Sequence, residues 1–346
     1  MLESIWFVLW GVLWAVYFML DGFDLGLGSL MPFLAKDEGE KRIVYNAMGP
    51  FWDGNEVWLI TAGGVTFAAF PTTYAVMFSG LYSALMLILF ALILRGVAME
   101  FRAKVDHPKW KAVWDGCLFV GSFLPALLLG VAFANIFHGI PIDEEGIYRG
   151  TLFTLLNPYG LLGGVLFVSL FLVHGAIWLA VKSEGELHDR AARLAPQLWV
   201  ALVVVAVMFL LATWYHTRLY DNYLKNPFLF VVPLALIPLL TLGALAAVRV
   251  AMAKGHWWSA WFASCGVIVG VTLFGVVGLY PNLLPSSLNP AFSMTIHNSA
   301  SSPLTLKIML GVALTCVPVV IGYQAWVYRL FKDKVRESDL AHEEGY

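Results

Sequence analysis

The stretch Pro50–Gly64, PFWDGNEVWLITAGG, decides the fold of this chain, because it either opens a short membrane span or stays outside the membrane. Two acids, Asp53 and Glu56, stand near its start, and an apolar run continues from it to Pro71. If this run crosses the bilayer, every later segment changes sides. The topology of the whole protein therefore depends on one short and partly acidic segment.

The composition of the chain is that of a membrane protein. Of its 346 residues, 60% are hydrophobic and only 13% are charged, whereas soluble domains carry about 25% charged residues. The mean hydropathy of +0.77 arises from repeated apolar runs of about 20 residues, the length that crosses about 30 Å of hydrocarbon. A net charge of -2 gives no indication of nucleic-acid binding, and the three cysteines lie in apolar runs without metal-ligand spacing.

Nine apolar runs are long enough to span a membrane, so the sequence predicts an all-α polytopic membrane protein. Their bounds are about 5–34, 54–70, 74–100, 112–138, 158–182, 198–221, 227–249, 258–280 and 304–330. With the N-terminus outside, 17 of the 21 Lys and Arg residues fall on the cytoplasmic side, as the positive-inside rule requires. This asymmetry is lost if the run at 54–70 is not a crossing. We therefore expect nine spans and a cytoplasmic C-terminus.

Two of the expected spans contain similar sequences. GVLWAVYFMLDG (Gly11–Gly22) aligns without gaps with GVLFVSLFLVHG (Gly164–Gly175), and the alignment pairs Asp21 with His174. An offset of four spans makes the two copies parallel. With five identities in twelve positions, a repeat and a chance match both stay open. A repeat would divide the chain into four-helix bundles at 1–138 and 158–280, a ninth helix at 304–330 and a cytoplasmic tail at 331–346.

Acidic side chains of the expected spans gather near the cytoplasmic side. Asp21 and Asp24 lie three residues apart on one helical face, about 24 Å and 29 Å from Ile5 by the helical rise. Each charge within a span costs at least about 2.5 kcal/mol near the bilayer centre, so it persists only when it is paired or functional. The acids that we expect to form a cytoplasmic proton path are Asp21, Asp24, Asp53, Glu56, Glu100 and Asp115. Neighbouring side chains that would support this path are Trp52, Asn55, Arg95 and Arg102.

Several of these residues also have structural interpretations. Asp53 and Glu56 have the spacing of an acidic capping box, and the tryptophans around them suit an interfacial aromatic belt. Arg95 could form an ion pair with Glu100 at a helix end. Neither interpretation explains Asp21, which lies deep within its span and has no helix end to cap. The joint pattern therefore favours a polar path from the cytoplasm.

The histidines give no indication of a haem site in this chain. Of the eight histidines, only His174 lies well inside an expected span, since His138 and His216 lie near the outer face, and no second histidine or well-placed methionine completes an axial pair. A single histidine in an apolar helix is more often a hydrogen-bonded packing residue than a ligand. We therefore expect neither haem nor metal held by this chain's own side chains.

Characteristic motifs extend from the first expected span to the last. They are LDGFDLGLG, FWDGNEVWLITAGGVTFAAFP, WDGCLFVGSFLPALLLGVAFAN, LLNPYGLLGGV, GELHDRA, and LLPSSLN followed by SSPLTLKIML. In composition and order these motifs resemble subunit II of the cytochrome bd quinol oxidases. The resemblance covers nearly the whole chain.

This resemblance implies a heterodimeric respiratory complex of the bacterial cytoplasmic membrane, which oxidises quinol and reduces oxygen to water. Two b-type haems, one d-type haem and the quinol-oxidising loop belong to subunit I, which this chain would scaffold. In the family, the Asp of the W-D-G-N motif, here Asp53, and the acids of the D-G-F-D motif, here Asp21 and Asp24, are associated with a proton route to subunit I. The other acids of the expected path are assigned from their depth alone.

Further partners are implied by the resemblance, and one alternative function stays open. Some family members hold a structural quinone in this subunit, and quinol, lipid and a small accessory membrane subunit are expected partners. The sequence does not place a quinone site. The connection around HTRLYDNYLKNP is short compared with longer members, so no function of that loop is transferred. The alternative is a proton-coupled secondary transporter, although acids clustered at one face rather than the midplane disfavour it.

Overall fold

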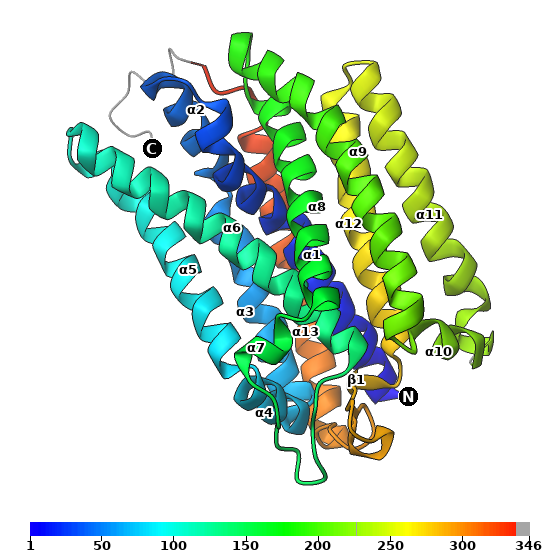
Figure 1. The fold of residues 1–346 in the computed structure, drawn as a ribbon. Coiled ribbons are helices and arrows are strands. Elements are labelled where there is room, and N and C mark those ends of the chain that lie inside the picture. Colours follow the sequence, from blue (N-terminus) through cyan, green and yellow to red (C-terminus); the bar gives the residue numbers. More distant parts are fainter. Residues whose placement is uncertain (226, 337–346) are drawn as a thin grey trace.

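Long helices make up most of the chain (Figure 1). The computed structural model describes residues 1–225 and 227–336. Of the tail expected at 331–346, the part from residue 337 onward lies outside the described residues. The helices are α1 (Leu2–Leu34), α2 (Glu38–Met48), α3 (Trp52–Ala69), α4 (Pro71–Gly80), α5 (Tyr82–Phe101), α6 (Pro108–His138), α7 (Leu152–Leu155), α8 (Pro158–Lys182), α9 (Gly185–His216), α10 (Leu219–Lys225), α11 (Pro227–Ala253), α12 (Trp257–Leu279) and α13 (Pro303–Leu330). The short elements are the 3-10 turns η1 (Arg102–Lys104) and η2 (Pro290–Phe292) and the antiparallel strands β1 (Asn282–Leu284) and β2 (Met294–Thr295).

Eight of the described helical segments are long and apolar enough to cross a membrane. They lie in α1, α5, α6, α8, α9, α11, α12 and α13. Helix α3, the expected second span, is not among them, because the acidic and polar residues of its first turns lower its hydropathy. Its 18 residues nevertheless rise about 27 Å, close to the thickness of the hydrocarbon core. The all-α membrane fold is thus confirmed, and the ninth crossing stays a prediction.

Reporter fusions on either side of α3 test the ninth crossing. If α3 spans the bilayer, a reporter after Lys36 should be cytoplasmic, one after Thr72 exterior and one after Ala103 cytoplasmic again, because α5 returns the chain. A fusion after Tyr346 should also report the cytoplasm. Reporters after Lys36 and Thr72 on the same side would contradict the nine-span topology.

Several boundaries differ from the expected spans where polar residues or proline intervene. The run expected at 74–100 is two helices, α4 and α5, that meet at Leu81. Pro71 begins α4 directly after α3, because proline lacks the N–H that a continued helix would need. Helix α9 begins at Gly185 and ends at His216, so the expected run at 198–221 misses its polar first turns. The connection after the first span contains an additional helix, α2.

Helices α1 and α8 pack closely through two glycines. A Cβ atom on Gly26 would lie 1.9 Å from the carbonyl oxygen of Phe171, and one on Gly175 would lie 2.7 Å from the Gly26 backbone. Small residues of this kind let membrane helices approach until their backbones touch. The ring of Phe18 meets the Phe167 ring edge-on across the same interface. These two helices contain the similar sequences Gly11–Gly22 and Gly164–Gly175. The internal repeat and the division of the chain into two four-helix bundles stay predictions.

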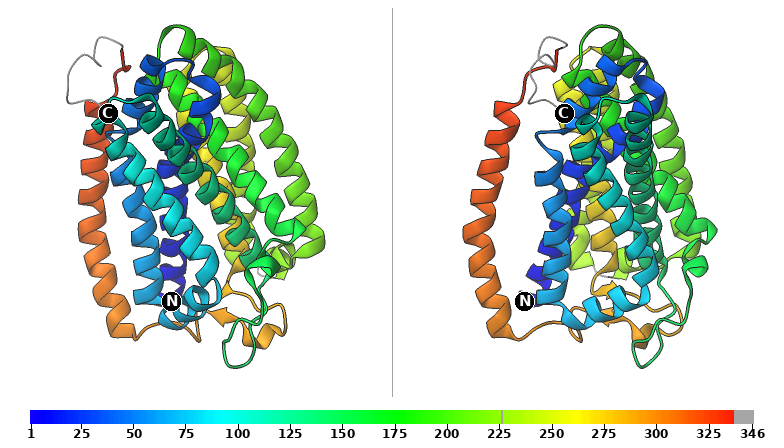
Figure 2. Two further views of the ribbon diagram at one scale, coloured as in Figure 1. Left: turned by 60° about the vertical axis from the view of Figure 1, so that its left-hand side comes forward. Right: turned by 90° about the vertical axis from the view of Figure 1, so that its left-hand side faces the viewer.

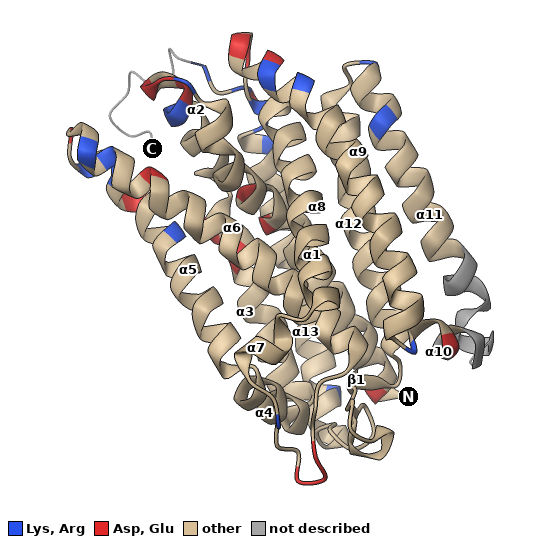
Figure 3. Ribbon diagram, in the orientation of Figure 1, with Lys and Arg blue, Asp and Glu red and all other residues tan. Residues whose placement is uncertain are grey.

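The two ends of the helical bundle differ in charge. Figure 3 shows most Lys and Arg residues at the end where α2 lies, which we call the basic end. Helix α13 stands at the side of the bundle (Figure 2), and Leu306 is its one buried residue. It is held at both ends, because the Trp6 indole donates to the carbonyl of Leu306 (3.0 Å) and the Lys182 ammonium donates to the carbonyl of Phe331 (2.6 Å).

Candidate functional site

Asp21, Glu56 and Arg95 form a buried ion cluster, to which α1, α3 and α5 contribute one residue each. Arg95 Nη2 lies 2.8 Å from Asp21 Oδ1 and 3.1 Å from Glu56 Oε2. The side chains of Asp21 and Arg95 are 0% and 2% exposed, whereas that of Glu56 is partly buried at 23%. The alternative of an Arg95–Glu100 pair at a helix end does not match this geometry, because Arg95 points into the bundle and Glu100 is exposed.

The buried ion cluster has hydrogen-bonding capacity that the described residues do not meet. The 2.8 Å approach of Arg95 to Asp21 is an ion pair without hydrogen-bond alignment, and neither Asp21 carboxylate oxygen has a hydrogen-bond partner. Nε and Nη1 of Arg95 likewise have no hydrogen-bond partner among the described residues. Buried polar groups are usually hydrogen-bonded, so unbonded polar atoms in a buried site need an explanation. We therefore treat the buried ion cluster as a candidate functional site and not as a purely structural ion pair.

Asp24 is held by a short chain of hydrogen bonds that reaches α13. Its Oδ2 atom accepts a hydrogen bond from Asn55 Nδ2 (2.7 Å), and Asn55 Oδ1 accepts one from the Tyr328 hydroxyl (3.1 Å). Asp24 and Asn55 are both buried. Tyr328 was not among the residues expected from the sequence. Gln324 and Tyr328, four residues apart on one face of an apolar helix, were the signal that could have identified it.

A cavity of about 350 Å³ opens beside Asn55 and contains the exposed acids Asp53 and Glu100. We call it the acidic cavity. Its walls come from the start of α3, the end of α5 and the side of α13, where Gln324 and Tyr328 line it. Asp53 thus lines the same cavity as Asn55, whose amide binds the buried Asp24.

Asp53 is not the cap of its helix. Helix α3 begins at Trp52, its N-cap is Phe51, and no side chain accepts a capping hydrogen bond there. The capping-box interpretation of Asp53 and Glu56 is therefore wrong.

Trp52 packs against α5, where a Cβ atom on Gly96 would lie 3.4 Å from its ring.

Asp115 and Arg102 belong to a second ion network, at the basic end. Arg102 Nε lies 2.6 Å from Asp115 Oδ1, and Lys41 Nζ lies 2.8 Å from Asp115 Oδ2. Arg102 also pairs with Glu38 of α2 at 2.8 Å. Burial alone would raise the pKa of Glu38, but the hydrogen bonds from Arg102 bring that pKa below its ordinary value. This network attaches α2 to η1, the turn that follows α5, and to α6. The place of Asp115 in a proton path stays a prediction.

His174 does not fit the role of a haem ligand. Its Nε2 atom lies 3.0 Å from the carbonyl oxygen of Met19, to which it donates, and its Nδ1 atom lies 2.6 Å from Ser264 Oγ. The ring is fully buried and stacks on Trp261. Both nitrogens are engaged, so neither is directed toward a metal. Within the described parts of the chain, no group of three His, Cys, Asp or Glu side chains suits a metal ion.

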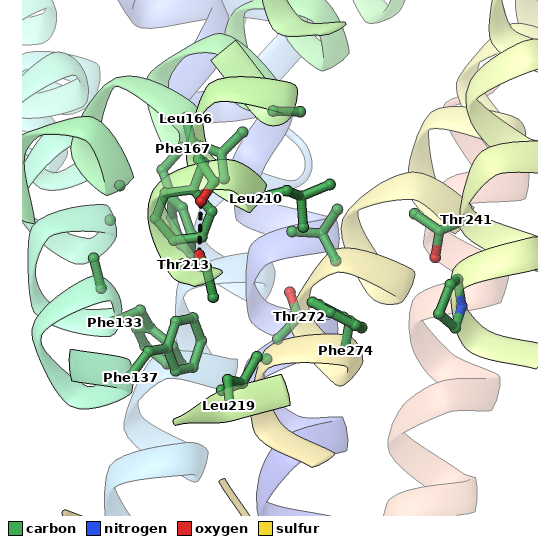
Figure 4. A pocket seen from close by; sticks show the side chains of 18 of the residues that line it. Phe133, Phe137, Leu166, Phe167, Leu210, Thr213, Leu219, Thr241, Thr272 and Phe274 are labelled. Carbon is green, nitrogen blue, oxygen red and sulfur yellow. Dashed lines mark hydrogen bonds between the residues drawn. The ribbon is translucent and has the colours of Figure 1, made fainter. Parts of the chain in front are cut away.

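An apolar cavity of about 490 Å³ lies between α6, α8, α9, α11 and α12 (Figure 4). Phe133, Phe167 and Phe274 form much of its wall. Its threonine and tyrosine hydroxyls already donate to backbone carbonyls, as Thr213 does to Phe209 (2.7 Å) and Tyr220 does to Leu210 (3.2 Å). This cavity suits an apolar molecule, and its lining shares no residue with the acidic cavity.

Comparison with known proteins links this arrangement to one family. The family described as cytochrome bd terminal oxidase subunit II matches residues 2–331. Cytochrome bd ubiquinol oxidase subunit 2 of Bacillus subtilis (strain 168) is 38% identical over 339 residues, which cover 98% of each chain. Cytochrome bd-I ubiquinol oxidase subunit 2 of Escherichia coli (strain K12) is 35% identical over 372 residues, covering 98% of this chain and 96% of the relative.

A solved structure shows the same fold. The bd oxidase from Geobacillus thermodenitrificans superposes with a TM-score of 0.77 over 95% of this chain and 98% of the other, at 17% identity. Together with the sequence relatives, this match favours the oxidase subunit over the transporter alternative.

Proposed function

This chain belongs to the cytochrome bd terminal oxidase subunit II family, and we propose that it scaffolds the haem-bearing subunit I and supplies it with cytoplasmic protons. It is a subunit of a membrane-bound quinol oxidase, a haem-containing complex in which it pairs with subunit I. One observation carries the proton-delivery proposal. Asn55, which donates a hydrogen bond to the buried Asp24, lines the same cavity as the exposed Asp53.

In the proposed path the carboxylates carry the proton and Asn55 positions them. Asp53 and Glu100 collect protons in the acidic cavity, and Asp24 receives them behind Asn55, a residue of the cavity wall to which it is hydrogen-bonded. Asp21, three residues before Asp24 on the same helix, would receive the proton next, as a member of the buried ion cluster. Asn55 is an amide and cannot itself exchange a proton at neutral pH, but its two hydrogen bonds hold the Asp24 carboxylate in place.

The charge balance of the buried ion cluster suits transient proton binding. Asp21 and Glu56 face the single cation Arg95, so the ionised cluster has one excess negative charge. In a low-dielectric interior an uncompensated charge is costly, and binding one proton removes it. The excess negative charge therefore supports the proposal that the cluster binds one proton and releases it again each time a proton passes along the path.

The proposal includes an orientation, with the N-terminus outside and the basic end in the cytoplasm of a bacterial cell. The distribution of Lys and Arg in Figure 3 supports it, since basic residues favour the cytoplasmic side. Substrate protons would then come from inside while quinol protons are released outside. Turnover would build a membrane potential without a pump.

The proposed complex holds its two b-type haems and its d-type haem in subunit I, and this chain holds none. His174→Gln should therefore leave the haem content of each assembled complex unchanged, because both ring nitrogens of His174 are already hydrogen-bonded, to Ser264 and to the Met19 carbonyl. Haem extraction and optical spectra of the purified complex measure this, with Ser264→Ala as a matched change on the same hydrogen bond. Loss of one haem per complex in His174→Gln alone would contradict the proposal.

A structural quinone in this subunit is a further part of the proposal, with quinol, lipid and a small accessory subunit as partners. The apolar cavity in Figure 4 supports it, because about 490 Å³ falls within the range of small-molecule sites. Its threonine hydroxyls are engaged with the backbone, so the cavity suits an isoprenoid tail better than a quinone ring.

A further inference from the structure

A groove of about 610 Å³, separate from the apolar cavity, runs between α13 and the helices α1 and α12. Figure 2 shows α13 at the edge of the bundle, and Leu306 is its one buried residue. The walls of the groove on the bundle side are aliphatic and aromatic. They include Met19 and Leu20 of α1 and Trp258, Trp261 and Phe262 of α12.

One face of α13 lines the groove. The residues are Ile321, Gln324, Ala325, Tyr328, Arg329 and, just past the helix, Lys332. Their spacing of three, four, seven, eight and eleven residues is that of a single helical stripe. From Ile321 to Arg329 this stripe rises about 12 Å and changes from apolar to cationic. The groove is therefore apolar along its length and basic at one end.

The cations at that end have no counter-charge within the described part of the chain. Arg329 and Lys332 are exposed, and neither forms an ion pair or hydrogen bond with a described residue. No acid is among the described residues that line the groove, in contrast to the acidic cavity on the other side of Gln324 and Tyr328. Trp258, at the start of α12, lies in the same groove, and indoles of this kind sit at the headgroup level of a bilayer.

We propose that this groove binds one anionic phospholipid. Its phosphate would lie between Arg329 and Lys332, and an acyl chain would follow the apolar wall toward Ile321. Basic pockets between membrane helices at the cytoplasmic side are the sites that bind anionic headgroups. A quinone would leave both cations without a counter-charge, and inorganic phosphate would leave the apolar wall uncovered. The lipid site is inferred without reference to the proton path, although its groove shares Gln324 and Tyr328 with the acidic cavity.

A bound lipid would also steady α13 against the bundle. Gln324 and Tyr328 line both the groove and the acidic cavity, and they donate hydrogen bonds to the Gly54 carbonyl (3.0 Å) and to Asn55 (3.1 Å). A lipid that fills the space behind them keeps these two side chains in reach of α3.

The test measures lipid retention by the purified two-subunit complex, using native mass spectrometry after delipidation and re-addition of defined lipids. The parent complex should retain one dioleoyl phosphatidylglycerol and prefer it over dioleoyl phosphatidylcholine by about tenfold or more, as two basic groups near a headgroup imply. The double change Arg329→Gln with Lys332→Gln should abolish this preference. Lys334→Gln, an exposed neighbour that does not line the groove, should leave it unchanged.

A second variant tests the apolar wall without altering charge. Ala325→Trp should fill the groove and release the lipid while the haem content of the complex stays normal. Equal retention of phosphatidylglycerol in the parent and in both variants would overturn the proposal. So would displacement of the lipid by inorganic phosphate alone, or the finding that a quinone rather than a phospholipid is lost from the variants. Absence of a retained lipid in the parent, as when subunit I covers the groove, would also overturn it.

Discussion

Asp53→Asn should assemble with its full haem content and yet lose most of its quinol oxidase turnover, by at least about tenfold. Asparagine keeps the shape of the side chain but cannot bind and release a proton. Since Asp53 caps no helix and is exposed in the acidic cavity, the change has no structural cost that would explain a loss. Oxygen consumption with quinol measures turnover, and optical spectra should show that quinol still reduces the haems.

A matched substitution outside the acidic cavity provides the control. Asp106 is an exposed acid that pairs with Lys111 at 2.7 Å and does not line the cavity, so Asp106→Asn should retain full turnover. Glu100→Gln should have a smaller effect than Asp53→Asn, because Asp53 remains to collect protons. Undiminished oxygen consumption in a fully assembled Asp53→Asn complex would show that this carboxylate is not the relay.

Arg95→Gln should have the largest effect on assembly. It removes the one cation of the buried ion cluster and leaves Asp21 and Glu56 without a counter-charge. Breaking a buried ion pair in this way costs about 3–5 kcal/mol, so we expect little assembled complex and a lower thermal midpoint for what remains. The yield of haem-containing complex and its thermal unfolding, followed by haem absorbance, measure the effect.

A second substitution separates charge from packing in this cluster. Asp21→Asn added to Arg95→Gln removes one of the uncompensated acids, so assembly should recover in part while turnover stays low. Arg249→Gln, an exposed arginine of α11, should change neither assembly nor turnover. A thermal midpoint in Arg95→Gln equal to that of the parent would mean that the ion pair with Asp21 contributes nothing to stability.

The membrane helices could be predicted because a bilayer leaves the backbone few alternatives. In hydrocarbon every peptide group must bond within the chain, so a long apolar run becomes a helix. The starts of α8 and α12 lie within one residue of the expected bounds. The first turns of α9 are polar and α2 is short and amphipathic, so a search for long apolar runs does not find them. Helix α2 is held by ion pairs with distant residues, such as that between Glu38 and Arg102.

The sequence by itself determined the depth of the acids, because depth along a helix is the residue count multiplied by the rise. Asp21, Asp24 and Asp53 could thus be assigned to one region of the bundle. Only the tertiary structure decided which groups meet there, since this depends on how each helix is rotated and packed against its neighbours. It paired Arg95 with Asp21 instead of leaving it at a helix end, and it brought Tyr328 of the last helix to the amide that holds Asp24.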